Sequence, residues 1–154
     1  MTSLATLPER HQRVMTDTSD PIHRACDFYV FGGERDLVAL NRRLHSQEVW
    51  SPWPDFLTAF ASNGCGDYFA YDTRQSPALV IYIGPDGTPE EQLADPEALR
   101  YDSFDEWYES QMERHTCSRC GSREVRFGAS KDKQWLLRVC PACGFQEQTD
   151  AIDL

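Results

Sequence analysis

The sequence lacks any long apolar run, because no stretch approaches the roughly 18 apolar residues that a membrane-spanning helix needs. Residues 1–13 are broken by polar side chains and contain no apolar core of a secretion signal. Internal repeats and low-complexity segments are also missing. With 154 residues, 40% of them apolar, the chain suffices for one ordinary core and a small accessory module. We therefore expect a globular cytoplasmic protein with no membrane partner.

Basic residues are scarce in the first part of the chain. Residues 1–112 hold 8 Lys and Arg against 19 Asp and Glu, a net charge of −11, whereas residues 113–154 hold 7 against 6, a net charge of +1. Within the first part, residues 86–109 carry nine acidic side chains and a single base, Arg100. Such a run repels nucleic acid and attracts a basic protein, although a merely solvated face has the same composition.

The sequence offers no recognisable set of acid, base and nucleophile. Cys65 lies between two glycines, as a nucleophile does, but no histidine is near it in sequence. We interpret Cys65 and Cys26 as small buried apolar residues. Asp67 and Asp72 are interpreted as caps of backbone groups beside a turn rather than as metal ligands. The sequence thus predicts no catalytic residue and no enzyme.

What the sequence does contain is a pair of Cys-x-x-Cys motifs near its end. The two-residue gap lets one tight turn present two thiolates to the same ion, and the 19 residues between the motifs leave room for a hairpin. Four thiolates close a tetrahedral site without a position for water or substrate, so we expect a structural metal ion. That ion is expected to be Zn²⁺, although an iron site of the rubredoxin type has the same ligand pattern. The predicted ligands are Cys117, Cys120, Cys140 and Cys143.

The cysteine spacing resembles that of zinc ribbons and covers about residues 115–150. We expect strands over residues 123–127, 133–139 and 145–149. His115 is interpreted as a solvated linker residue rather than a substitute ligand, and Trp135 as part of a small core rather than a platform for stacked bases. Ribbons of this kind often bind nucleic acid, and this one carries six basic residues, but its near-neutral charge disfavours that ligand. A ribbon that contacts nucleic acid or a nucleoprotein complex stays an alternative.

Ahead of the cysteines, the patterns predict helices alternating with strands. We expect a short helix over residues 8–15, a strand over 27–31, a helix over 34–44, a helix capped by Ser51 that stops at Asn63 and Gly64, strands over 68–72 and 78–83, and a helix after a capping box of Ser103 and Glu106.

The stretch of residues 62–72 must reverse the chain between a predicted helix and the predicted strands. Gly64 and Gly66 reach positive φ at little steric cost, and Asn63 visits the left-handed region more readily than most residues. We predict that these three residues form a structural hinge.

Several short motifs between residues 34 and 112 resemble those of the SUKH superfamily, which includes bacterial immunity proteins and the fungal cell-wall assembly regulator family. They occur in the family's order at suitable spacing. The motifs are Pro54-Asp55-Phe56-Leu57, Asn63-Gly64, Gly64-Cys65-Gly66-Asp67-Tyr68-Phe69-Ala70-Tyr71-Asp72, the strand over residues 77–83, and Ser103-Phe104-Asp105-Glu106-Trp107. The resemblance implies an α+β fold with a mixed β-sheet and flanking helices. It also implies a non-catalytic protein that binds a partner, in bacteria typically a toxin. A strand ahead of the first helix and a zinc ribbon depart from the family's usual pattern.

Together these observations predict a four-part chain. Residues 1–21 form a polar segment, 22–112 a SUKH-like α+β domain, 113–150 a zinc ribbon, and 151–154 a tail. The expected function is protein binding with a basic partner. The family resemblance implies either an immunity protein that neutralises a toxin or an interaction scaffold, and the sequence leaves both open. We expect the contact surface to combine acidic residues with aromatic anchors. The predicted partner-binding residues are Asp95, Glu97, Tyr101, Asp102, Trp107 and Tyr108.

Overall fold

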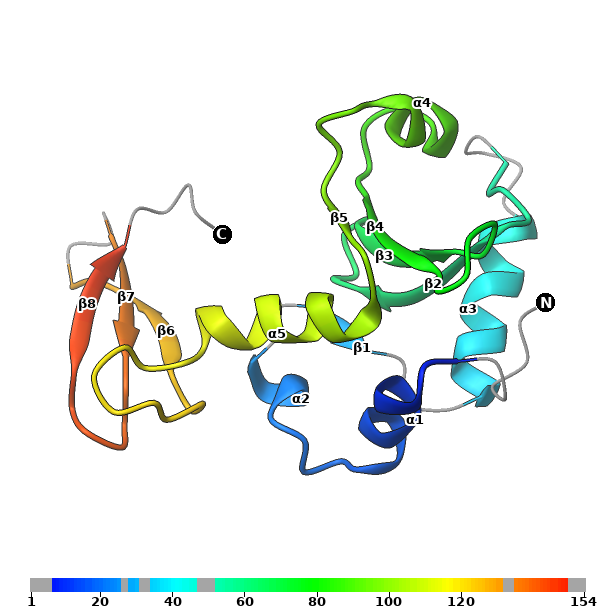
Figure 1. The fold of residues 1–154 in the computed structure, drawn as a ribbon. Coiled ribbons are helices and arrows are strands. Elements are labelled where there is room, and N and C mark those ends of the chain that lie inside the picture. The colour runs from blue at the N-terminus through cyan, green and yellow to red at the C-terminus, as the bar shows by residue number, and fades with distance from the viewer. Residues whose placement is uncertain (1–6, 26–27, 31–33, 47–51, 132–134, 150–154) are drawn as a thin grey trace.

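The computed structural model describes residues 7–25, 28–30, 34–46, 52–131 and 135–149. Its first part is an α+β domain built on a five-stranded sheet in the order β1-β2-β3-β4-β5 (Figure 1). Every described strand pair is antiparallel, so the sheet is not the mixed one that the family resemblance implied. The strands are β1 (Tyr29–Val30), β2 (Leu57–Ser62), β3 (Tyr68–Asp72), β4 (Leu79–Ile83) and β5 (Arg100–Tyr101).

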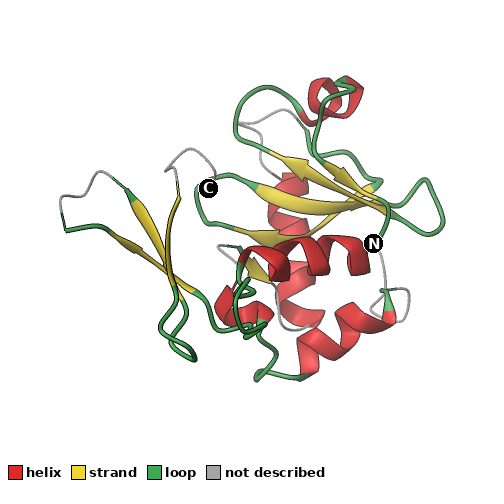
Figure 2. Ribbon diagram, turned by 60° about the vertical axis from the view of Figure 1, so that its left-hand side comes forward, coloured by secondary structure: helices red, strands yellow, loops and turns green. Residues whose placement is uncertain are grey.

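Helices cover both faces of this sheet, because its central strands are apolar on both sides (Figure 2). One core cluster joins α1, α2 and α5 to the face that carries Phe60, Phe69 and Val80. A second cluster joins α3 and α4 to the face that carries Ala59 and Ile81. The helices are α1 (Glu9–Thr16), α2 (Ile22–Ala25), α3 (Glu34–Ser46), α4 (Pro89–Ala94) and α5 (Phe104–Arg114).

The predicted helix that ends at Asn63 and Gly64 is wrong, because residues 57–62 form strand β2. All six residues of β2 are buried, and a strand buried on both faces has a continuous apolar run that periodicity cannot tell from a helix. Ser51, the predicted cap, lies outside the described residues. The remaining predicted elements of this domain are present. Of the strand expected over residues 27–31, β1 is the described part, and Asp27 and Phe31 lie outside the described residues.

The predicted hinge is the loop of a β-hairpin between β2 and β3, not a helix stop. Gly64 has φ of 80° and Gly66 has φ of 100°, which confirms the predicted left-handed backbone. The Asn63 side-chain oxygen accepts hydrogen bonds from the N–H groups of Cys65, at 2.8 Å, and Asp67, at 3.2 Å. These bonds give the loop an ordered turn.

The predicted capping box at α5 is half formed. Ser103 Oγ accepts from the Glu106 N–H at 3.2 Å, but the Glu106 carboxylate accepts from the N–H of Asp102 and not of Ser103. Both halves of a capping box occur instead at α4, between Thr88 and Glu91.

A second, three-stranded antiparallel sheet follows α5, in the order β6-β7-β8. It projects beyond the C-terminal end of α5, away from the first sheet (Figure 1). The strands are β6 (Arg126–Ala129), β7 (Leu136–Val139) and β8 (Gln146–Thr149). The three strands expected of a ribbon are therefore present, each within a few residues of its predicted range.

Candidate metal centre and acidic groove

The two Cys-x-x-Cys motifs form turns with the same backbone hydrogen bonds. In the first, the Cys117 C=O accepts from the Gly121 N–H at 2.9 Å, and the Cys117 N–H donates to the Ser122 C=O at 2.8 Å. In the second, Cys140 bonds in the same way to the Gly144 N–H and the Phe145 C=O, each at 2.9 Å. The glycines have φ of 72° and 70°, as each turn requires.

The four sulfur atoms of these turns lie within 4.8 Å of one another. The Sγ atoms of Cys117 and Cys143 are 3.7 Å apart, and those of Cys120 and Cys140 are 3.6 Å apart. A tetrahedral ion with metal–sulfur bonds of about 2.3 Å places its ligand atoms about 3.8 Å apart. The arrangement therefore fits a metal ion held by four cysteines, as the sequence predicted.

The electrostatics of the cluster also suit a cation. Desolvation opposes ionisation of Cys117, but the N–H groups of Cys120 and Arg119 and the neighbouring thiols together lower its pKa to about 7. At Cys120 an N–H of Ser122 lowers the pKa, but hydrogen bonds with the surrounding thiols and desolvation raise it to about 12. Four thiolates this close repel one another unless a cation lies between them.

Arg138 on β7 connects this centre to the rest of the chain. Its guanidinium donates to the Thr116 C=O at 3.0 Å and to the Glu147 carboxylate at 3.1 Å. It also lines a small cavity beside Cys117 and Cys140. Arg138 thus joins β7 to β8 and to the residue that precedes Cys117.

Two residues near the cysteines differ from their predicted roles. His115 is buried rather than solvated, and its ring packs edge-on against Phe127 at 5.0 Å between ring centres. Trp135 is 41% exposed rather than part of a core, because the small apolar cluster of the ribbon consists of Val125 with the buried cysteines, Phe127 and Phe145.

Two of the three predicted aromatic anchors are not on the surface. Trp107 is fully buried and Tyr108 is 3% exposed, because both lie on the face of α5 that packs against the sheet and α1. Tyr101 is half-buried at the sheet edge, whereas Asp95, Glu97 and Asp102 are exposed. The carboxylates of the predicted contact surface are thus available to a partner, and two of its three aromatic rings are not.

The structure places three glutamates of α5 in one groove, which sequence reasoning missed. Their spacing of three and four residues puts them on the same side of the helix. The groove has a volume of about 550 Å³ and is lined by Tyr101, Glu106, Glu109, Ser110, Glu113 and Thr116. The spacing of these glutamates along the helix that follows the capping box could have predicted this acidic side from the sequence.

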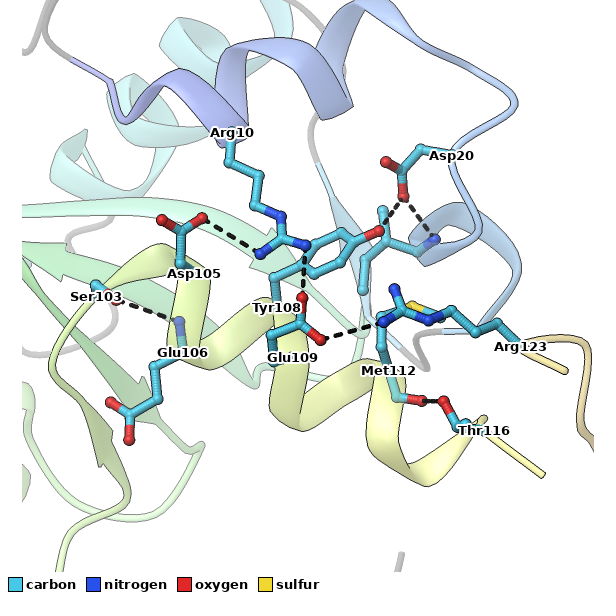
Figure 3. A network of polar contacts seen from close by, with 11 residues as sticks. Arg10, Asp20, Ser103, Asp105, Glu106, Tyr108, Glu109, Met112, Thr116 and Arg123 are labelled. Atoms are coloured by element: carbon cyan, nitrogen blue, oxygen red, sulfur yellow. Dashed lines mark hydrogen bonds and ion pairs between the residues drawn. The ribbon is translucent and has the colours of Figure 1, made fainter. Parts of the chain in front are cut away.

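One wall of this groove is tied to two other parts of the chain through Glu109 (Figure 3). Arg10 of α1 donates to Glu109 at 2.6 Å, and Arg123 beside the ribbon lies 3.4 Å from its other oxygen. The Arg10 guanidinium also stacks 4.0 Å above the Tyr108 ring. Burial, and then the hydrogen bond of its hydroxyl to Asp20, raise the pKa of Tyr108 to about 12.

The residues considered for catalysis do not converge. Cys65 is exposed at the tip of the β2–β3 hairpin, which corrects the prediction that it is buried. Asp72 is paired with Arg74 at 2.6 Å, and Asp67 accepts from the Tyr82 hydroxyl at 2.5 Å. Both carboxylates also lie beside turns, and Asp72 accepts from the Arg74 N–H. Cys26 lies outside the described residues.

Comparisons with known proteins provide no relative: no protein-family model, no curated protein and no solved structure matches this chain. Among the described residues, no helix is long and apolar enough to cross a membrane.

Proposed function

We propose that this protein is a non-catalytic cytoplasmic binding protein that holds a basic partner protein in the groove between β5 and α5. The observation that carries the proposal is the lining of that groove by Glu106, Glu109 and Glu113 beside the half-buried ring of Tyr101. Carboxylates attract lysine and arginine, and an aromatic face adds a favourable contact with their cations. Arg10 and Arg123 pair with Glu109, whereas Glu106 and Glu113 form no ion pair among the described residues, so these two carboxylates give the groove its negative charge.

The resemblance to the SUKH superfamily supports a role in immunity, in which the partner is a toxin. Nucleases, which immunity proteins often neutralise, need basic surfaces to hold a phosphate backbone, and a negative groove is complementary to such a surface. A toxin gene beside the gene for this chain would support the immunity role.

We further infer that the ion of the four-cysteine centre is zinc and that it is structural. Four thiolates fill a tetrahedral shell, so no coordination position is left for water or substrate. The ribbon has only a small apolar cluster of its own, so metal ligation would supply most of the stability of its fold.

The groove is tested by capture of binding proteins from the native cell on immobilised protein, with identification by mass spectrometry. The double variant Glu106→Gln and Glu113→Gln removes two charges, and the amide oxygen introduced at position 106 can still accept from the Asp102 N–H. A matched control, Asp36→Asn with Glu90→Gln, removes two exposed charges outside the groove. We expect the wild type and the control to capture a basic protein, which salt releases. We expect the groove variant not to capture it. Equal recovery on all three proteins would contradict the proposal.

A further inference from the structure

One face of the ribbon sheet is apolar at its centre and turned away from α5. Phe127 packs against His115, and Arg138 donates to Thr116, so the face with these side chains is turned toward the end of α5. In the pairing register Leu137 lies opposite Gly128 and Gln148, and directly paired residues project to the same side. The outer ribbon face therefore consists of Arg126, Trp135, Leu137, Val139, Gln146 and Gln148.

The outer ribbon face has the composition of a protein interface. Trp135 is 41% exposed, and Leu137 and Val139, on the same side of β7, are half-buried. Exposed polar residues flank this apolar strip on β6 and β8. Arg126 on this face and Lys131, which follows Ser130 at the end of the β6–β7 pairing, are exposed and form no ion pair among the described residues, so each adds a positive charge beside the apolar strip. A nucleic-acid base would stack on Trp135 but would gain little from the two aliphatic side chains.

The same chain carries a segment of complementary character at the edge of the first sheet. Leu99 is 49% exposed and immediately precedes the edge strand β5. Its C=O accepts from the Tyr82 N–H at 3.1 Å, which holds the backbone in place. Exposed carboxylates of Asp95, Glu97 and Asp102 surround it in sequence. The Leu99 segment, defined as residues 95–102, thus presents one exposed apolar side chain among negatively charged side chains.

We propose that a second copy of this chain covers the outer ribbon face, with its Leu99 segment against Trp135 and Leu137. Among the described residues Tyr29, Leu99 and Trp135 are the exposed large apolar side chains, and the last two have rims of opposite charge. Burial of the apolar centres stabilises the contact, and the charged rims select its orientation. Each copy carries one ribbon and one Leu99 segment, so two copies that exchange both contacts close a twofold dimer. This inference shares Tyr101 with the groove of the proposed function but rests on the outer ribbon face, so the test of the dimer and the capture of a partner can fail separately.

The dimer is tested by analytical ultracentrifugation of the full chain over a range of concentrations. One variant reverses the ribbon charges, with Arg126→Glu and Lys131→Glu. The other reverses the segment charges, with Glu97→Arg and Asp102→Arg. Each variant alone places like charges at both contacts, so we expect its dimer to be at least about tenfold weaker than the wild type. An equimolar mixture places opposite charges at both contacts, so we expect it to recover the dimer.

A third variant, Trp135→Ala, removes the apolar centre and should weaken the dimer without a change of charge. Metal content and circular dichroism of each variant show whether the fold is intact. The proposal is overturned by a wild-type chain that stays monomeric, by single reversals that dimerise like the wild type, or by a mixture that stays monomeric. It is also overturned if labelled single-stranded oligonucleotides bind the ribbon and depend on Trp135.

Discussion

At the scale of single residues, His11 on α1 is held in the core as a neutral base. Its ring stacks on Phe104 with 4.7 Å between ring centres, and its Nδ1 lies 2.7 Å from the Tyr71 hydroxyl. The residue is fully buried, and burial lowers its pKa to about 3. Protonation of His11 therefore favours the unfolded chain.

We expect this histidine to make the protein acid-sensitive. Its folded pKa lies below its unfolded value of about 6.5, so the unfolded state binds more protons between those two values. The contribution of neutral His11 is complete above pH 6.5 and falls by about 1.4 kcal/mol per pH unit below it. His11→Phe keeps the stacking on Phe104 and removes the proton site.

The measurement is the free energy of unfolding of both proteins in urea between pH 7.5 and 5, where most carboxylates stay ionised. We expect the free energy of unfolding of the wild type, relative to that of His11→Phe, to decrease as the pH falls. A difference that is constant with pH would contradict the assigned burial.

At the scale of elements, helix α3 bonds through the Asn41 side chain to the backbone of β2, beyond the described part of the edge strand β1. In its described residues, the edge strand β1 pairs with Ala61 and Ser62 of β2. At Ala59 the side chain of Asn41 takes the place of a neighbouring strand, because its amide donates to the Ala59 C=O and accepts from the Ala59 N–H, each at 2.8 Å. The register of β2 against β3 shifts between Ala59 and Ala61, next to this contact.

We expect Asn41→Leu to destabilise the domain by about 2 kcal/mol or more. Leucine has nearly the same size but leaves two buried backbone groups of Ala59 without a partner, each of which costs about 1–3 kcal/mol. The measurement is urea unfolding followed by fluorescence. Arg43→Ala, at an exposed position of the same helix, serves as the control and should change stability by less than about 0.5 kcal/mol. An Asn41→Leu protein as stable as this control would contradict the role of the amide.

At the scale of the whole molecule, the two sheets differ in what stabilises them. The first has two apolar clusters, one on each face, whereas the second has a small cluster around Cys117 and Cys140. A structural zinc centre of this kind contributes an apparent 10–16 kcal/mol or so to folding. Removal of the metal should therefore affect the two parts of the molecule unequally.

We expect purified protein to contain about one zinc ion per chain. A chelator should increase hydrogen exchange over residues 117–149 and leave β2, β3 and β4 protected. Zinc content by atomic emission should be lost in Cys117→Ser and kept in Cys65→Ser, since Cys65 lies outside the cluster. A metal-free chain with a protected ribbon would show that the four cysteines are not a structural site.

The sequence by itself determined the features whose cause is local. The Cys-x-x-Cys-Gly turns close on their own backbone, so their spacing specified both the sulfur cluster and the positive φ of Gly121 and Gly144. Helix α5 followed from its N-cap Ser103, and the positive φ of Gly64 and Gly66 from their residue type, although the loop that contains them was predicted as a helix stop.

Only the tertiary structure decided features that depend on distant partners. β2 became a strand because helices cover both faces of its sheet, which the helix-like order of its apolar residues did not reveal. Trp107 is buried because α5 turns its aromatic side to the sheet, and Trp135 is exposed because nothing described packs over the outer ribbon face. Burial is a property of what lies opposite a side chain in space, and a single sequence does not record that neighbour.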